Sequence, residues 1–238
     1  MKLLIYQSIQ SPNEIKIEIV AKPYKLPKLF NPDLAPFIEY CHIRHLPTKQ
    51  IIIRPGDPAD KMYYLIEGSA TITIEDENKS DIILDYLNAG DFIGETGLFV
   101  RQETREVMVR ARTACIIAEI SYSRLRDLAS SDLKHSYSSI LFALATHISY
   151  RLLHANRKVG HLAFMDAAGR VASALMDLCK QPDALTHPDG MQLKMSRTEL
   201  GRIVGCSREM VGRVLKNMEQ QGLITAHGKT IVVFGARE

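Results

Sequence analysis

Residues 196–224, "SRTELGRIVGCSREMVGRVLKNMEQQGLI", constrain the fold most strongly, because they predict two short helices joined by a tight turn. Ser196 followed three residues later by Glu199 forms a capping box, which marks the start of a helix. Gly205 belongs to the turn, and Ser207 caps the second helix. Two helices at this spacing are typical of a helix-turn-helix motif.

The second predicted helix has two chemically different faces. At about 100° per residue, one face carries Arg208, Glu209, Arg213 and Lys216 around Gly212. The opposite face is apolar and consists of Met210, Val211, Val214, Leu215 and Met218. A glycine inside a helix costs about 1 kcal/mol relative to alanine, so Gly212 predicts a close approach to another backbone.

The polar face suits recognition of double-stranded DNA. Its two arginines could each donate two hydrogen bonds to a guanine edge, and Glu209 could accept one from a cytosine amine. Arg197, Ser207 and Lys216 suit contacts to phosphates. The following "LITAHGKTIVVFG" predicts a hairpin, or wing, whose tip residue Lys229 could reach the DNA backbone. The alternative is an amphipathic helix whose basic face is merely solvated.

Charge is distributed unevenly along the chain, whose net charge is +3. From Lys194 to the end there are eight Lys and Arg and four Asp and Glu, a balance of +4. The other 193 residues carry 22 basic and 23 acidic side chains, a balance of −1. Basic charge gathered in one terminal segment is typical of nucleic-acid binding.

The segment from Tyr40 to Tyr122 predicts a small β-roll, sandwich or barrel, because short strand-like runs alternate with Gly, Pro and Asp turns. In "ATITI" the alternation places Ala70, Ile72 and Ile74 on one face.

From about residue 138 the pattern becomes helical for more than twenty residues without proline. One stripe of this helix contains Leu141, Leu144, Ile148 and Ala155. The stripe could pack on its own domain or against the helix of a second copy, as in a two-stranded coiled coil. A second helix over residues 166–181, the loop "PDALTHPDG" and the helix-turn-helix follow.

Length and composition describe an ordinary soluble globular protein of 238 residues, long enough for one large or two modest domains. The first residues make a poor signal peptide, and no stretch reaches the ~20 apolar residues of a membrane span. We therefore expect a cytoplasmic protein without membrane contact. The four cysteines and eight histidines are dispersed, so no metal site is expected. No nucleophile–base pair supports an enzyme.

Five segments in order resemble the CRP/FNR family of transcription regulators, and its cAMP-receptor branch in particular. They are "YLNAGDFIGETGLF", "VRARTACIIAEISY", "KVGHLAFMDAAGR", "QPDALTHPDGMQ" and "GRIVGCSREMVGRVLK". The resemblance implies an α+β activator. Its implied parts are an uncertain extension (1–30), a cyclic-nucleotide-binding β-roll (31–135), a dimerisation helix with hinge (136–165) and a winged helix-turn-helix (166–238).

The resemblance also implies partners. A homodimer would bind double-stranded DNA at two-fold TGTGA-like half-sites, because dimer symmetry requires paired half-sites. The residues matching the family's base readers are Arg208, Glu209 and Arg213. Two surfaces would contact RNA polymerase. One consists of Ala184, Thr186, His187, Pro188, Asp189 and Gly190, and the other of His42, Arg44 and Arg124.

The effector pocket departs from the family pattern. Glu95 matches the residue that accepts the ribose hydroxyl, Arg105 matches the one that pairs with the cyclic phosphate, and amides near Gly94 add donors. The position after the arginine, a serine in the family, is Glu106. A carboxylate about 4 Å from a phosphate repels it by roughly 1–4 kcal/mol, which predicts weakened cAMP binding.

A second departure lies on the long helix, where Ala155 and Asn156 replace the Thr–Ser pair that reads adenine in the family. Ala155 has no side-chain donor or acceptor, whereas Asn156 has both. "TREV" also resembles the Clp branch, which is linked to cyclic di-GMP and binds DNA without cAMP.

Three interpretations of the pocket stay open. It could bind cAMP weakly, with Glu106 turned outward, or bind another nucleotide such as cyclic di-GMP. It could also be vestigial, with Arg105 and Glu106 satisfied by protein partners, such as an ion pair between Arg105 and Glu95. No tightly bound cofactor is expected. A functional alternative of a different class is a nucleotide-sensing module that acts through protein contacts and has lost DNA binding.

Overall fold

The computed structural model describes residues 6–7, 17–18, 34–75 and 81–236. The chain divides into two compact units, one of residues 29–156 and one that combines residues 1–28 with 157–238. Strands β1 (Tyr6–Gln7) and β2 (Ile17–Glu18) pair antiparallel. The remainder of the predicted N-terminal extension lies outside the described residues.

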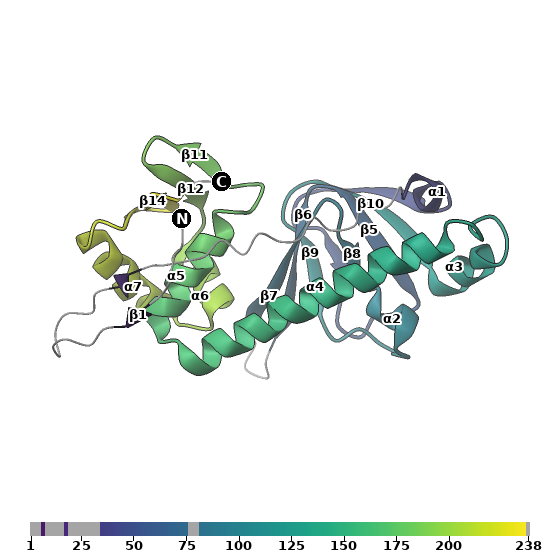
Figure 1. Ribbon diagram of the computed structural model, residues 1–238, viewed down its shortest axis with the longest axis horizontal. Helices are drawn as coiled ribbons and strands as arrows, with labels where there is room; N and C mark the ends of the chain where they lie inside the picture. The colour runs from purple at the N-terminus through teal and green to yellow at the C-terminus, as the bar shows by residue number, and fades with distance from the viewer. Residues whose placement is uncertain (1–5, 8–16, 19–33, 76–80, 237–238) are drawn as a thin grey trace. The chain divides into compact units, whose positions relative to one another are not determined.

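The first unit contains two four-stranded antiparallel sheets, as the segment from Tyr40 to Tyr122 predicted (Figure 1). One has the order β3-β10-β5-β8 and the other β4-β9-β6-β7. Their apolar faces form a common core that includes Leu65, Ile72 and Ile117. The strands are β3 (His42–Leu46), β4 (Ile51–Ile53), β5 (Lys61–Glu67), β6 (Ser69–Glu75), β7 (Asp81–Asn88), β8 (Phe92–Ile93), β9 (Met108–Ala111) and β10 (Cys115–Ser121).

The alternation predicted for β6 holds only over its first half. Ala70 and Ile72 are buried, but Ile74 is 42% exposed and Thr73 is buried instead. The pairing of β6 with β7 shifts register between Ile72 and Thr73. An irregularity of this kind changes which side chains face the core, so the prediction for Ile74 was wrong.

Four helices accompany the β-roll: α1 (Ala35–Ile38), α2 (Thr96–Phe99), α3 (Tyr122–Ala129) and the long α4 (Tyr137–Phe164). Three of them share a buried cluster around Phe92, to which α1 contributes Phe37 and α3 contributes Leu125. Leu144 of α4 is fully buried in the same cluster, and Leu141 packs against it. The N-terminal part of α4 therefore packs on its own domain.

A different stripe of α4 is left exposed. Ala155, predicted to continue the stripe of Leu144, is exposed in a single chain. Seven of the exposed residues repeat at alternating spacings of three and four along the helix: Phe142, Ala145, Ser149, Leu152, Asn156, Val159 and Ala163. This is the spacing of a coiled-coil seam, and we call these seven residues the α4 seam. The two alternatives for this helix, packing on its own domain and packing against the helix of a second copy, thus involve different faces.

The second unit contains α5 (Ala167–Leu178), α6 (Arg197–Val204) and α7 (Arg208–Gln220) with a four-stranded sheet of order β11-β12-β14-β13. The predicted caps are confirmed. Ser196 Oγ accepts from the Glu199 amide at 3.1 Å, and Ser207 Oγ accepts from the Met210 amide at 3.2 Å. Gly205 ends α6 in the left-handed conformation, with φ of 63°. The motif is a helix-turn-helix, as predicted.

The sheet of this unit is larger than the predicted hairpin. Strands β13 (Ile224–His227) and β14 (Thr230–Phe234) form that hairpin, with Gly228 and Lys229 at its tip. The segment predicted as a loop contains β11 (Leu185–His187), and the unpredicted β12 (Gly190–Lys194) joins it to β14. Strand β12 is stabilised by pairing with β14, which is distant in sequence, and β11 is stabilised by pairing with β12.

The two glycines of the helix-turn-helix have different surroundings. A Cβ at Gly212 would meet only the side chain of Arg197, at 3.7 Å, which is an ordinary contact. The predicted close backbone approach at Gly212 is therefore absent from the described part of the chain. A Cβ at Gly201 in α6 would lie 2.6 Å from the carbonyl oxygen of Cys206, so the close approach occurs there.

Candidate functional site

Arg105 is a buried cation held by backbone oxygens. Only 6% of its surface is exposed, and its guanidinium donates to the carbonyls of Gly94, at 3.3 Å, and of Lys61. The guanidinium also lies 5.9 Å from the centre of the Tyr122 ring, whose hydroxyl donates to the same Gly94 carbonyl. Among the described residues, no carboxylate lies within ion-pair distance of Arg105. Because buried charges are ordinarily paired, this site can accept an anion.

Two separate features require a glycine at position 94. Its φ is +76°, a conformation that L side chains rarely adopt, and a Cβ would lie 3.0 Å from Arg105 Nη1. The glycine thus lets the guanidinium lie against the backbone beside Glu95. Helix α2, which begins at Thr96, is a single turn, so its dipole adds little.

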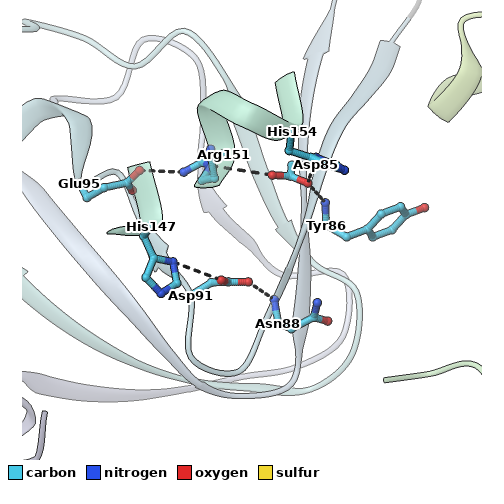
Figure 2. Close-up of polar contacts among 8 residues, drawn as sticks. All are labelled: Asp85, Tyr86, Asn88, Asp91, Glu95, His147, Arg151 and His154. Atoms are coloured by element: carbon cyan, nitrogen blue, oxygen red, sulfur yellow. Dashed lines mark hydrogen bonds and ion pairs between the residues drawn. The ribbon is translucent and has the colours of Figure 1, made fainter. Parts of the chain in front are cut away.

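Glu95 is a buried carboxylate with one oxygen in use (Figure 2). It is 1% exposed, and its Oε1 accepts from Arg151 Nη1 of helix α4 at 2.8 Å. Its Oε2 is also buried and has no hydrogen-bond partner among the described residues. A ligand hydroxyl could donate to Oε2. Such a bond would be favourable, because a buried acceptor without a donor has lost its hydrogen bonds to water and gained none in return.

The ion pair suggested between Arg105 and Glu95 is wrong, because Glu95 pairs with Arg151 instead. The sequence contained a signal for Arg151 that we missed, since it lies one helical turn before Ala155 on the same side of the long helix. Glu106 is exposed, as the first interpretation of the pocket requires. Asn156 belongs to the exposed α4 seam, next to Ala155.

A second contact between α4 and the β-roll lies beside the pocket (Figure 2). His147 Nδ1 is 3.4 Å from Asp91 Oδ1, and Asp91 Oδ2 accepts from the Asn88 amide at 2.7 Å. Burial raises the pKa of the Asp91 carboxyl to about 6 and lowers the pKa of His147. The imidazole also packs edge-on against Phe92, with ring centres 5.4 Å apart.

In the second unit, the predicted reading face of α7 is open to solvent. Arg208, Glu209, Arg213 and Lys216 are exposed. The opposite face, consisting of Val211, Val214, Leu215 and Met218, is buried, while Met210 at its edge is 40% exposed. The helix therefore has one face packed in the core and one exposed face that carries its charged side chains.

The residues assigned to phosphate contacts are spread over three elements. Ser207 is exposed at the start of α7, and Lys229 is exposed at the tip of the β13–β14 hairpin. Arg197 is half-buried beside Gly212, and its Nε is buried with no hydrogen-bond partner in the ranges that the structure describes. Ser207 already accepts the Met210 amide, so its hydroxyl hydrogen is what it can offer a phosphate.

Comparisons with known proteins agree with this arrangement. Residues 43–132 match the family described as "Cyclic nucleotide-binding domain", and residues 169–234 match the "Crp-like helix-turn-helix domain". The cAMP-activated global transcriptional regulator CRP of Salmonella typhimurium is 51% identical over 207 residues, which cover 87% of this chain and 96% of that protein.

The chain belongs to the CRP/FNR family of transcription regulators.

Two further relatives of this CRP/FNR regulator come from Xanthomonas. The CRP-like protein Clp of Xanthomonas axonopodis pv. citri is 47% identical over 201 residues, covering 84% of this chain and 87% of that protein. The solved structure of the c-di-GMP responsive global regulator CLP of Xanthomonas campestris superimposes with a TM-score of 0.80 at 47% identity, covering 84% and 97% of the two chains. These relatives are regulators, and this family member is not an enzyme.

The first surface assigned to RNA polymerase lies on the β11–β12 hairpin of this regulator. Thr186, Pro188 and Asp189 are exposed there, and Ala184 and His187 are half-buried. Gly190 is buried, and a Cβ at this position would overlap the carbonyl oxygen of Val233, so the position requires a glycine. The turn residues Pro188 and Asp189 are thus exposed, whereas Gly190 at the start of β12 lies against β14.

The second such surface surrounds a hollow of about 240 Å³. His42 and Arg124 line it, but Arg44 is turned to Glu119, with 2.7 Å between Nη1 and Oε2. Lys61 Nζ is 2.8 Å from the other oxygen of Glu119 and also lines the hollow. Burial would raise the pKa of Glu119, but its bonds to Lys61 and Arg44 outweigh this and lower it. Part of the predicted positive charge is therefore neutralised within the protein.

No helix in the described ranges is long and apolar enough to cross a membrane.

Proposed function

We propose that this CRP/FNR regulator is a dimeric, sequence-specific DNA-binding protein whose effector is a ribonucleotide bound between Glu95 and Arg105. The proposal rests on two buried charged groups of the pocket, the Glu95 carboxylate and the Arg105 guanidinium. Within the described part of the chain, Glu95 Oε2 is a buried acceptor without a donor, and Arg105 is a buried cation without a carboxylate. A ribose hydroxyl would donate a hydrogen bond to Glu95 Oε2, and a phosphate would pair with Arg105.

A dimer is supported by the α4 seam. Its residues follow the three–four spacing of a two-stranded coiled coil, and Leu152 and Val159 are 60% and 64% exposed in one chain. Asn156 lies on the same seam, next to Ala155. A second copy seated on the seam would bring its Asn156 near the first copy's pocket, as the family resemblance implies for the base-reading pair.

DNA recognition is assigned to α7. Arg208, Glu209 and Arg213 would read bases in the major groove, and Arg197, Ser207, Lys216 and Lys229 would contact phosphates. Two-fold TGTGA-like half-sites follow from the resemblance and from dimer symmetry. The surface of residues 184–190 and that of His42, Arg44 and Arg124 are proposed contacts to RNA polymerase.

The DNA proposal is tested with a duplex that carries two TGTGA half-sites and with a second duplex of the same composition in which both are scrambled. Fluorescence anisotropy at moderate salt should give at least about thousandfold tighter binding to the first, the lower end for specific regulators. Arg213→Ala should reduce this preference, whereas Lys216→Ala should weaken binding to both duplexes alike. Equal affinity of the unchanged protein for the two duplexes would contradict the proposal and favour a protein-interaction module.

The effector is identified by calorimetric titration of the full chain with cAMP, cGMP and cyclic di-GMP. Glu106 predicts that cAMP binds, but weakly. Cyclic di-GMP is the second candidate, because the chain is 47% identical to a cyclic-di-GMP-responsive regulator. If none of the three titrations gives a binding heat, the pocket is vestigial and the regulator binds DNA without a nucleotide.

A further inference from the structure

The guanidinium of Arg151 lies between two carboxylates (Figure 2). Its Nη1 is 2.8 Å from Glu95 Oε1, and its Nε is 3.8 Å from Asp85 Oδ2. Glu95 is almost completely buried, whereas the side chains of Arg151 and Asp85 keep 30% and 22% of their surface exposed. One cation on helix α4 thus connects the effector pocket with strand β7.

The contact between Arg151 and Glu95 is one-sided. Arginine and a carboxylate favour a fork in which two nitrogens meet two oxygens. Here a single nitrogen meets a single oxygen, and Glu95 Oε2 stays buried without a partner among the described residues. The Nε edge of the guanidinium, which forms the other possible fork together with Nη2, faces Asp85 instead.

Asp85 is itself held in place. Its Oδ1 accepts from the Tyr86 amide at 3.0 Å, and His154 Nδ1 lies 3.6 Å from the same oxygen. His154 is on α4, three residues after Arg151 and therefore on nearly the same side of the helix. Strand β7 thus provides a fixed carboxylate on the side of Arg151 that Glu95 does not occupy.

We propose that Asp85 is a positioning residue of the effector pocket: it keeps Arg151 in its one-sided contact and so leaves Glu95 Oε2 open to a ligand hydroxyl. Without the charge of Asp85, the guanidinium turns toward Glu95, takes both oxygens and closes the acceptor. Asp85 touches no ligand and acts only through Arg151. The inference rests on the proposed function, because the hydroxyl is that of a nucleotide ribose.

The test compares cAMP with 2′-deoxy-cAMP, which differ only in that hydroxyl. By calorimetry on the full chain, the unchanged protein should bind cAMP at least about tenfold more tightly, as expected for one hydrogen bond to a charged group. In Asp85→Asn this ratio should fall to about twofold or less, because Oε2 is no longer available. A ratio in Asp85→Asn equal to that of the unchanged protein would overturn the proposal.

Asp91→Asn is the matched control. It removes the same charge from the same side of α4, but Asp91 is paired with His147 and makes no ion pair with Arg151. This variant should keep the ratio of the unchanged protein. Loss of the ratio in both variants alike would show that any acidic residue facing α4 has this effect, which also contradicts a specific role of Asp85.

A ligand-free measurement separates this inference from the proposed effector. The Nε–H resonance of Arg151, assigned with Arg151→Lys, should shift in Asp85→Asn and stay in place in Asp91→Asn. If the unchanged protein binds neither nucleotide, the proposed effector is wrong, and the resonance alone decides the role of Asp85. An unshifted resonance in Asp85→Asn would overturn the inference whatever the nucleotides do.

Discussion

Glu106 is the residue that most distinguishes this pocket from the family pattern, and its exposure decides how large its effect can be. Because the carboxylate is in contact with water, its repulsion of a phosphate belongs near the lower end of the range expected at 4 Å, about 1 kcal/mol. Glu106→Ser should therefore tighten cAMP binding about fivefold in calorimetry.

Glu103→Ser is the control for Glu106, because it removes the same charge from an exposed position of the same loop. It should change the cAMP dissociation constant by less than about twofold. Equal effects of the two substitutions would mean that only the net charge of the loop matters and that Glu106 has no specific place at the phosphate.

Asp91 makes the stability of the first unit depend on pH. Its pKa is raised by burial to about 6, whereas an unfolded aspartate titrates near 3.9. Between these values the folded chain keeps a proton that the unfolded chain has lost, so the free energy of unfolding falls as pH rises from about 4 to about 6.

The side chain of Asp91→Asn cannot ionise, so the free energy of unfolding of this variant should not show the decline. In the unchanged protein the decline should be about 1–2 kcal/mol, after allowance for the partial exposure of Asp91. Urea unfolding of both proteins at four pH values between about 4 and 7 measures the difference. The pKa of His147 is lowered by burial, which affects both proteins and largely cancels in the comparison. Parallel curves for the two proteins would show that Asp91 does not carry the effect.

At the scale of elements, the two glycines of the helix-turn-helix should respond oppositely to alanine. In Gly201→Ala the new methyl would lie 2.6 Å from the Cys206 carbonyl, so α6 and the turn must separate at a cost of about 1–3 kcal/mol. In Gly212→Ala the nearest atom is 3.7 Å away, and the higher helix propensity should stabilise α7 by up to about 1 kcal/mol.

Thermal unfolding followed by circular dichroism compares the two variants with the unchanged protein. The melting temperature should fall for Gly201→Ala and rise or stay level for Gly212→Ala. A clear destabilisation by Gly212→Ala would mean that α7 meets a neighbour that the contacts of Gly212 do not include.

At the scale of the whole molecule, the α4 seam predicts which substitutions break the dimer. Leu152 lies on the seam and Leu153 beside it, yet both are 60% exposed in one chain. Leu152→Glu would place two carboxylates against each other in an apolar contact and should weaken dimerisation at least about tenfold. Leu153→Glu adds the same charge outside the seam and should leave the dimer intact.

Sedimentation velocity over a series of concentrations measures both variants. Dissociation by Leu153→Glu but not by Leu152→Glu would place the partner on another face of α4. If neither variant dissociates, the dimer does not depend on this helix.

The sequence alone determined the local structure of this regulator. Helix starts at Ser196 and Ser207, the left-handed turn at Gly205 and the two faces of α7 depend on residues within a few positions of one another, so periodicity and capping rules predict them. The hairpin predicted for residues 223–235 follows from the same kind of local pattern. The family resemblance rests on longer runs of the same chain.

Tertiary structure decided what depends on contacts between distant residues. The irregular pairing that exposes Ile74, the strand β12 and the close approach at Gly201 each involve a partner that local sequence does not specify. The pairing of Glu95 with Arg151, 56 residues further along the chain, was invisible for the same reason. Side-chain charge can be read from a sequence, but the neighbour that neutralises it is chosen by packing. Among the described residues, that choice leaves Arg105 without a carboxylate and Glu95 Oε2 without a donor.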